Sequence, residues 1–212
     1  MLASEDIPEN DPWWFRQPIS GNAVTSILDK PTQRAAFRQI RDSYVNGLTA
    51  QDRSLAFSKI PSPLAKVLMP GKIVAGYVAK GSEVDPAAIL AQAHAMGCDL
   101  ALPHVTSKSA PMRFLRWSPD DDLVPGVFGL LQPAETAPEC KPDIVLVPML
   151  AYDDRLIRLG QGAGHYDRAL SVLDQSIAIG LAWSVQFTSA LASDIWDVPL
   201  DAVLTEKSWI TL

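Results

Sequence analysis

The chain has 212 residues, of which 48% are hydrophobic and 20% are charged. This composition excludes a disordered or fibrous protein, and the length favours one domain around a single core. The 24 Asp and Glu residues outnumber the 18 Lys and Arg residues, so the net charge at pH 7 is −6. Because a nucleic-acid backbone attracts basic surfaces, we expect no nucleic-acid partner. A site for a small anion would have to gather a few cations locally.

The first residues and the cysteines favour a cytoplasmic location. The N-terminal sequence is acidic and lacks the basic and apolar regions of a secretory signal. No run of about 18 or more apolar residues could span a membrane. Cys98 and Cys140 are too few for a disulfide framework or a zinc site. We therefore expect a soluble cytoplasmic protein that does not bind a membrane.

Residues 1–31 are interpreted as an irregular N-terminal arm. The segment is rich in proline, shows no helical or strand period, and contains Trp13, Trp14 and Phe15. These side chains could bind a partner, or they could pack back on their own domain, which is the favoured alternative. Residues 32–212 would then form one domain.

Two helices are predicted after the arm. Apolar residues recur at three- and four-residue steps from Phe37 to Leu48, which is typical of an amphipathic helix. Thr49 and Asp52 resemble a capping box, with Asp in place of Glu, so a second helix is predicted from there to about residue 59.

From residue 72 onward, strand and helix patterns alternate. A helix over 86–96 separates predicted strands over 72–78 and 99–103. Strands joined in this way pair in parallel with a right-handed crossover, so helices cover both faces of the sheet. Further elements are a helix over 166–173, strands over 113–117, 144–147, 176–182 and 202–204, and a short strand over 127–130 within a long loop. The predicted fold class is α/β, with three layers (α/β/α) and a mostly parallel, Rossmann-like central sheet.

The segment 143–168 indicates a site. A buried strand leads into a polar loop, and Gly160, Gly162 and Gly164 then alternate before a helix. Ligands of open α/β sheets bind beyond the carboxyl ends of the strands, and glycines at such a turn let backbone N–H groups approach an anion. Arg158 could add a full positive charge. The pattern is neither a Walker A loop nor G-x-G-x-x-G, so its spacing alone favours phosphate binding and a plain tight turn equally.

The string LVPMLAYD…RLGQGAGHYDR resembles the signature of the 5-formyltetrahydrofolate cyclo-ligase family, also called methenyltetrahydrofolate synthetases. Other stretches fall in the family's order, namely 34–38, 49–53, 83–85, 128–133, Gln186, Asp197 and 205–206. The resemblance implies the ATP- and Mg²⁺-dependent conversion of 5-formyltetrahydrofolate into 5,10-methenyltetrahydrofolate. In that scheme the formyl oxygen takes the γ-phosphoryl group of ATP, N10 of the folate attacks, and phosphate leaves. Such a reaction requires positioning and charge stabilisation more than a protein nucleophile.

The resemblance also implies a nucleotide site. Arg34 and Arg38, one helical turn apart, would reach the ATP phosphates, and Arg158 would act on them as a catalytic charge. Asp167 would be catalytic by holding Mg²⁺ as a hard oxygen ligand. The rest of the nucleotide site would be the turn formed by Leu159, Gly160, Gln161, Gly162, Ala163, Gly164, His165 and Tyr166. Without the resemblance, the two helix arginines could be a solvated face, and Asp167 could serve the dipole of its helix.

The substrate, a reduced folate, would contact Val78 and Glu83, with His165 on the same side of the turn. Glu83 could instead cap the helix that follows it. Most family members carry Tyr or Phe at the position of His165, whose imidazole could stack on a pterin or be merely tolerated.

Several positions depart from the family pattern. Arg34 replaces a lysine, and Gln161 stands where some members carry a basic residue. Ala163 stands where others carry Lys or Gly. Leu156 replaces a loop glycine, so we expect that turn to adopt another shape or length. Three hypotheses remain open: an active cyclo-ligase, a nucleotide-binding but non-catalytic or regulatory paralogue whose arm contacts a partner, and an ATP-dependent enzyme with another heterocyclic substrate.

Overall fold

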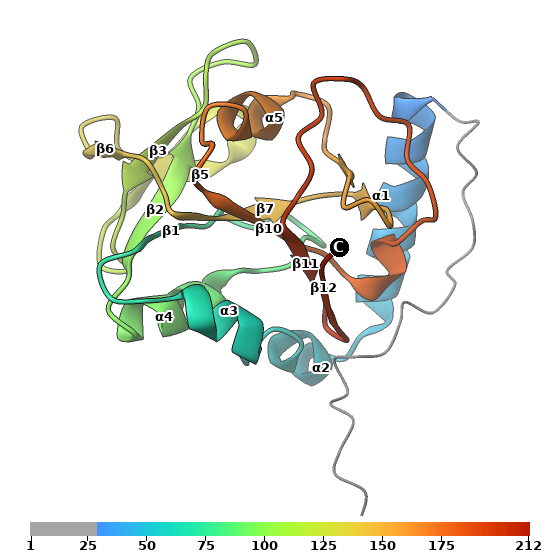
Figure 1. Cartoon of the computed structure of the whole chain (residues 1–212), viewed down its shortest axis with the longest axis horizontal. Coiled ribbons are helices and arrows are strands. Elements are labelled where there is room, and N and C mark those ends of the chain that lie inside the picture. The colour runs from blue at the N-terminus through green and yellow to red at the C-terminus, as the bar shows by residue number, and fades with distance from the viewer. Residues whose placement is uncertain (1–28) are drawn as a thin grey trace, which may run out of the picture.

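The computed structural model describes residues 29–212, whose arrangement is shown in Figure 1. The predicted arm therefore lies outside the described residues except for its last three positions. Lys30 already belongs to the first helix, α1 (Lys30–Gly47). Asp29 caps this helix because its carboxylate accepts a hydrogen bond from the backbone N–H of Thr32 at 2.9 Å.

An eight-stranded sheet forms the centre of the molecule, in the order β12-β11-β10-β7-β1-β2-β3-β6. The middle strands pair in parallel, whereas the outer strands at both edges are antiparallel to their neighbours. The strands are β1 (Ile73–Ala75), β2 (Asp99–His104), β3 (Arg113–Arg116), β6 (Glu139–Cys140), β7 (Ile144–Pro148), β10 (Ile177–Leu181), β11 (Ala202–Leu204) and β12 (Trp209–Ile210). The mostly parallel α/β sheet expected from the sequence is confirmed.

Helices cover both faces of this sheet. Figure 1 shows α3 and α4 on one side and α5 on the other, with α1 beside the sheet. The remaining helices are α2 (Ala50–Leu55), α3 (Ser62–Val67), α4 (Ala87–Ala95) and α5 (His165–Leu170). None of the helices within 29–212 is long and apolar enough to cross a membrane.

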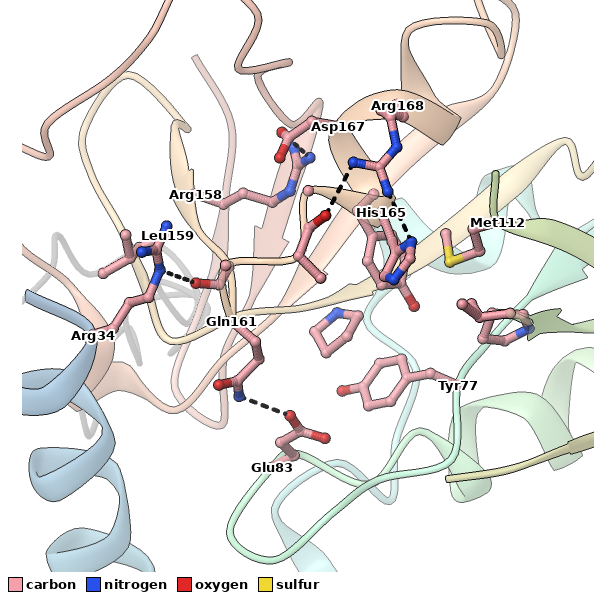
Figure 2. Close-up of a pocket in the computed structure, with 18 of the residues that line it drawn as sticks. Arg34, Tyr77, Glu83, Met112, Arg158, Leu159, Gln161, His165, Asp167 and Arg168 are labelled. Atoms are coloured by element: carbon pink, nitrogen blue, oxygen red, sulfur yellow. Dashed lines mark hydrogen bonds and ion pairs between the residues drawn. The ribbon is translucent and has the colours of Figure 1, made fainter. Parts of the chain in front are cut away.

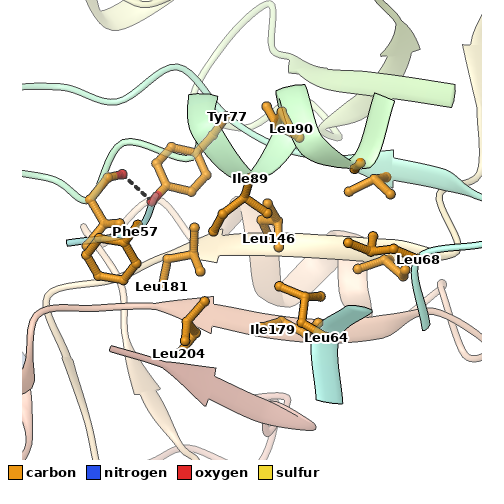
Figure 3. Packing of buried hydrophobic residues seen from close by; sticks show 14 of the residues in the cluster. Phe57, Leu64, Leu68, Tyr77, Ile89, Leu90, Leu146, Ile179, Leu181 and Leu204 are labelled. Atoms are coloured by element: carbon orange, nitrogen blue, oxygen red, sulfur yellow. Dashed lines mark hydrogen bonds between the residues drawn. The ribbon is translucent and has the colours of Figure 1, made fainter. Parts of the chain in front are cut away.

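Two apolar clusters fill the space between the sheet and its helices. Successive strand residues point to opposite faces, so Val74 and Leu146 belong to one cluster, while Ala75 and Val147 belong to the other. Figure 3 shows the first cluster, in which residues of α3 and α4 pack against β7, β10 and β11. Because both faces are covered, the central strands are apolar throughout rather than alternating.

Several elements differ from the sequence prediction. The strand predicted over 127–130 is a 3₁₀ turn, Val127–Gly129, that joins β4 (Leu123–Pro125) to β5 (Leu131–Pro133). Gly129 has φ +67°, which is incompatible with an extended strand. The second helix ends at Leu55 rather than near 59, and α3 was not predicted.

A small hairpin beyond β7 carries Arg158 into the site. It consists of β8 (Ala151–Tyr152) and β9 (Arg158–Leu159), joined by a turn in which Leu156 has φ +57°. The expectation that leucine would change the shape of this turn is wrong, because Leu156 adopts the left-handed backbone that usually favours glycine. The buried carboxylate of Asp153 supports the turn by accepting hydrogen bonds from the N–H groups of Arg155 and Ile157, both at 3.0 Å.

Candidate functional site

A cavity of about 1270 Å³ lies beyond the carboxyl ends of β1, β2 and β7. Tyr77 after β1, Pro103 of β2 and Pro148 of β7 line it, which is the place where open α/β sheets bind ligands. Figure 2 shows side chains from distant parts of the sequence, from Arg34 to Arg168, converging there. Every site residue that the sequence analysis named lines this cavity, namely Arg34, Arg38, Val78, Glu83, Arg158, Leu159, Gly160, Gln161, Gly162, Ala163, Gly164, His165, Tyr166 and Asp167. Their individual roles stay predictions.

The glycine turn approaches α1 closely. Gly162 has φ +103°, and a Cβ atom at this position would lie 3.3 Å from the guanidinium carbon of Arg34. Gly164, the N-cap of α5, also has a positive φ, of +67°. Side chains at these two positions would therefore strain the backbone, and at Gly162 a side chain would also crowd the arginine.

Two arginines of α1 face this turn. Arg34 donates from Nε to the carbonyl oxygen of Gly160 at 3.0 Å, and Arg38 donates from Nη2 to Oε1 of Gln161 at 2.8 Å. Residues four apart lie on the same face of a helix, so both guanidinium groups reach one cavity wall. The turn and α1 thus gather the local positive charge that an anion requires.

Arg158 and Asp167 form an ion pair at the cavity wall. The Arg158 side chain is only 3% exposed, and its Nη2 lies 2.5 Å from Oδ1 of Asp167. Arg158 also donates to the carbonyl oxygen of Val198. Burial lowers the pKa of Arg158, whereas Asp167 and Asp197 favour its charged form. Arg158 is thus a fixed, buried charge that orients the carboxylate predicted to bind Mg²⁺.

Glu83 is held on the opposite wall, beside a residue that the sequence analysis missed. Arg41 is buried, donates from Nε to Oγ of Ser82 at 2.9 Å, and lies 3.8 Å from Oε1 of Glu83. Burial lowers the pKa of Arg41, and Glu83 and Asp42 oppose this shift. The sequence did contain a signal, because 34, 38 and 41 follow the spacing of one helix face.

Arg168 links the glycine turn to the loop after β2. It donates from Nη1 to the carbonyl oxygen of Ala163 at 3.0 Å and from Nη2 to that of Lys108 at 3.3 Å. The same Nη2 lies 3.0 Å from Nδ1 of His165, which must accept because a guanidinium can only donate. Burial and the charge of Arg168 lower the pKa of His165, so its imidazole is neutral at pH 7.

Comparisons with known proteins agree with this geometry. Residues 27–206 match the model of the 5-formyltetrahydrofolate cyclo-ligase family. A 5-formyltetrahydrofolate cyclo-ligase from Mycolicibacterium smegmatis is 32% identical over 158 residues, which cover 69% of this chain and 80% of that protein. One from Haemophilus influenzae is 36% identical over 97 residues, which cover 43% of this chain and 52% of that protein.

The fold is similar to that of solved structures. The NMR structure of Aquifex aeolicus 5,10-methenyltetrahydrofolate synthetase matches with a TM-score of 0.69 and 28% sequence identity, covering 87% of this chain and 93% of that one. The sequence motifs, the sheet topology and these matches agree, and the chain belongs to the 5-formyltetrahydrofolate cyclo-ligase family.

Proposed function

We propose that the protein catalyses the ATP- and Mg²⁺-dependent conversion of 5-formyltetrahydrofolate into 5,10-methenyltetrahydrofolate in the cytoplasm. Membership of this family makes the protein a ligase. One observation carries the finer assignment: the arginines of α1, the glycine turn and Glu83 all line a single cavity. A phosphate-bearing cosubstrate and a heterocycle with N–H donors could therefore lie side by side.

The triphosphate of ATP would lie between α1 and the glycine turn. Arg34 and Arg38 present guanidinium groups there, and bonds from arginine to phosphate are short and charge-assisted. The positive φ of Gly162 lets backbone N–H groups approach the same oxygens. Arg158 would add a charge that burial and its two partners hold in place.

Mg²⁺ would be held at Asp167. This ion prefers oxygen ligands and commonly binds one or two carboxylates together with substrate phosphates. Asp167 fits this role, because its side chain is 27% exposed at the cavity wall even though Oδ1 contacts Arg158. Residues 29–212 contain no group of three or more His, Cys, Asp or Glu that could hold a metal. Phosphate and water oxygens would therefore complete the coordination, and the bound ion would neutralise phosphate charge.

The chemical step requires a better leaving group than a formamide oxygen. The formyl oxygen takes the γ-phosphoryl group, and ADP departs. N10 then forms a bond with the formyl carbon and loses its proton, the C–O bond breaks, and inorganic phosphate carries the oxygen away. Arg38 and Arg158 would stabilise charge on the phosphoryl oxygens during the transfer.

The reduced folate would occupy the part of the cavity next to Glu83. The carboxylate can accept hydrogen bonds from N–H groups of a pterin. Val78 adds apolar surface, and the neutral imidazole of His165 is suited to stacking or hydrogen bonding without adding charge. Tyr77, whose hydroxyl donates to the carbonyl oxygen of Val84 at 2.6 Å, fixes the loop that carries Glu83.

An assay of the purified full chain with 5-formyltetrahydrofolate, ATP and Mg²⁺ tests the proposal. We expect the near-ultraviolet absorbance of the methenyl product to rise together with an equal amount of ADP, and to stay flat when ATP or Mg²⁺ is omitted. Absence of product under all conditions would refute it. ATP binding without turnover would favour the non-catalytic paralogue. A rise in the unfolding temperature with an unrelated heterocycle, but not with folates, would favour another substrate.

A further inference from the structure

The side-chain amide of Gln161 joins the two halves of the cavity. Its Oε1 accepts a hydrogen bond from Nη2 of Arg38 at 2.8 Å, and its Nε2 donates to Oε1 of Glu83 at 3.2 Å. Figure 2 shows Gln161 reaching from the glycine turn towards Glu83. Arg38 belongs to α1 and Glu83 to the loop after β1, so one amide connects residues from three separate segments.

Both carboxylate oxygens of Glu83 already accept hydrogen bonds within the protein. Oε2 of Glu83 already accepts the backbone N–H of Lys80 at 3.0 Å. Oε1 faces the amide of Gln161 and lies 3.8 Å from the buried guanidinium of Arg41. A substrate N–H group directed at Oε1 must therefore displace the amide of Gln161 or share the oxygen with it.

The contact with Arg38 is the one that a nucleotide would break. The Arg38 side chain is exposed and is held in the cavity by a neutral amide oxygen. A phosphate oxygen is a stronger acceptor for a guanidinium than an amide carbonyl. Once Arg38 turns to a phosphate, Gln161 loses one of the two hydrogen bonds that hold it across the cavity.

We propose that Gln161 couples the two ligand sites, so that nucleotide binding increases the affinity for the reduced folate. Without a nucleotide, Arg38 and Glu83 hold the amide over the carboxylate, and the folate must break that contact to bind. When a nucleotide is bound, Gln161 loses its hydrogen bond from Arg38. Its amide then leaves the carboxylate of Glu83 more readily. Linkage requires that the folate increase the affinity for the nucleotide by the same factor.

The size of the effect follows from the contact that is removed. A typical hydrogen bond, after its exchange with water is taken into account, corresponds to a factor of about 3 to 10 in affinity. We therefore expect the Kd of 5-formyltetrahydrofolate to fall by about that factor when the nucleotide site is filled. This coupling rests on the proposed function, because it requires that both ligands bind to the cavity.

Isothermal titration calorimetry of the full chain tests the coupling. The Kd of 5-formyltetrahydrofolate is measured with and without a saturating, non-hydrolysable ATP analogue and Mg²⁺. For Gln161→Ala and for Gln161→Met, which keeps the length of the side chain but removes its amide, the ratio of the two values should be close to 1. Both variants should bind folate without nucleotide about as tightly as the native chain binds it with nucleotide. Gln51→Ala, at an exposed position of α2, is the matched control and should keep the native ratio.

The outcomes separate the coupling from the proposed function. If the native chain does not bind the nucleotide analogue, the proposed function and the coupling both fail. If the native chain binds both ligands with a ratio of 1, only the coupling is refuted. It is also refuted if Gln161→Met keeps the native ratio, because the hydrogen bonds of the amide would then play no part.

Discussion

The left-handed backbone of Leu156 leads to a prediction in which two opposing effects can be separated. Leu156 has φ +57°, and its side chain is 1% exposed. An L-residue in this conformation costs about 1–2 kcal/mol, whereas truncation of a buried leucine to alanine costs about 2–5 kcal/mol. Packing therefore outweighs strain, and both Leu156→Ala and Leu156→Gly should lower the free energy of unfolding.

The stabilities of the two variants should follow the reverse of the usual order, in which alanine is more stable than glycine. Alanine keeps the backbone penalty and glycine removes it, so Leu156→Gly should be more stable than Leu156→Ala by about 1 kcal/mol. At Leu146, which is fully buried in β7, the order should reverse, because glycine in a strand is about 0.5–1 kcal/mol less favourable than alanine. Urea unfolding of all four variants measures both differences. An alanine variant at 156 that equals or exceeds the glycine variant would refute the assignment of strain to this backbone.

Three further predictions concern the site, alkaline stability and the core. Asp167→Ala should abolish Mg²⁺-dependent turnover and leave the circular dichroism spectrum unchanged; full activity would contradict the metal assignment. Burial and the hydrogen bond to Glu206 raise the pKa of Tyr44 from 10.0 to about 12, so stability should fall as pH rises between these values, because only the unfolded state loses the proton. In Tyr44→Phe the free energy of unfolding should fall less steeply over this pH range. A slope identical to that of the native chain would contradict the role given to Tyr44. Gly180→Ala should cost about 1–3 kcal/mol in thermal unfolding, because the new Cβ would lie 2.1 Å from Cε of Met149; an unchanged midpoint would show that Met149 moves away freely.

The buried strands could be predicted from sequence because their apolar runs are continuous. The strand predicted over 202–204 coincides with β11, and the one predicted over 144–147 differs from β7 by one residue. The prediction failed at 127–130, where an apolar run bends into a turn at Gly129. Local periodicity indicates which residues are buried, but it does not show where a short apolar segment reverses direction.

Part of the site could also be predicted, because α1 and the glycine turn carry local patterns. The pairing of Arg158 with Asp167 and the bridge from Arg38 to Glu83 through Gln161 could not. These contacts join positions up to 123 residues apart, and no spacing in the sequence encodes them. Arg41 was missed for another reason: its helix-face spacing was visible, but a buried arginine is uncommon enough that sequence alone does not favour it.

The two edges of the central sheet have a consequence for self-association. An edge strand with free N–H and C=O groups is a template onto which another chain can add a strand. Here the edges are β6 and β12, each two residues long and antiparallel to its neighbour. A strand this short offers an incoming chain very few backbone N–H and C=O groups with which to pair. Within residues 29–212, the sheet is therefore poorly suited to continue from one molecule into the next, and aggregation by edge-to-edge pairing would first require these ends to unfold.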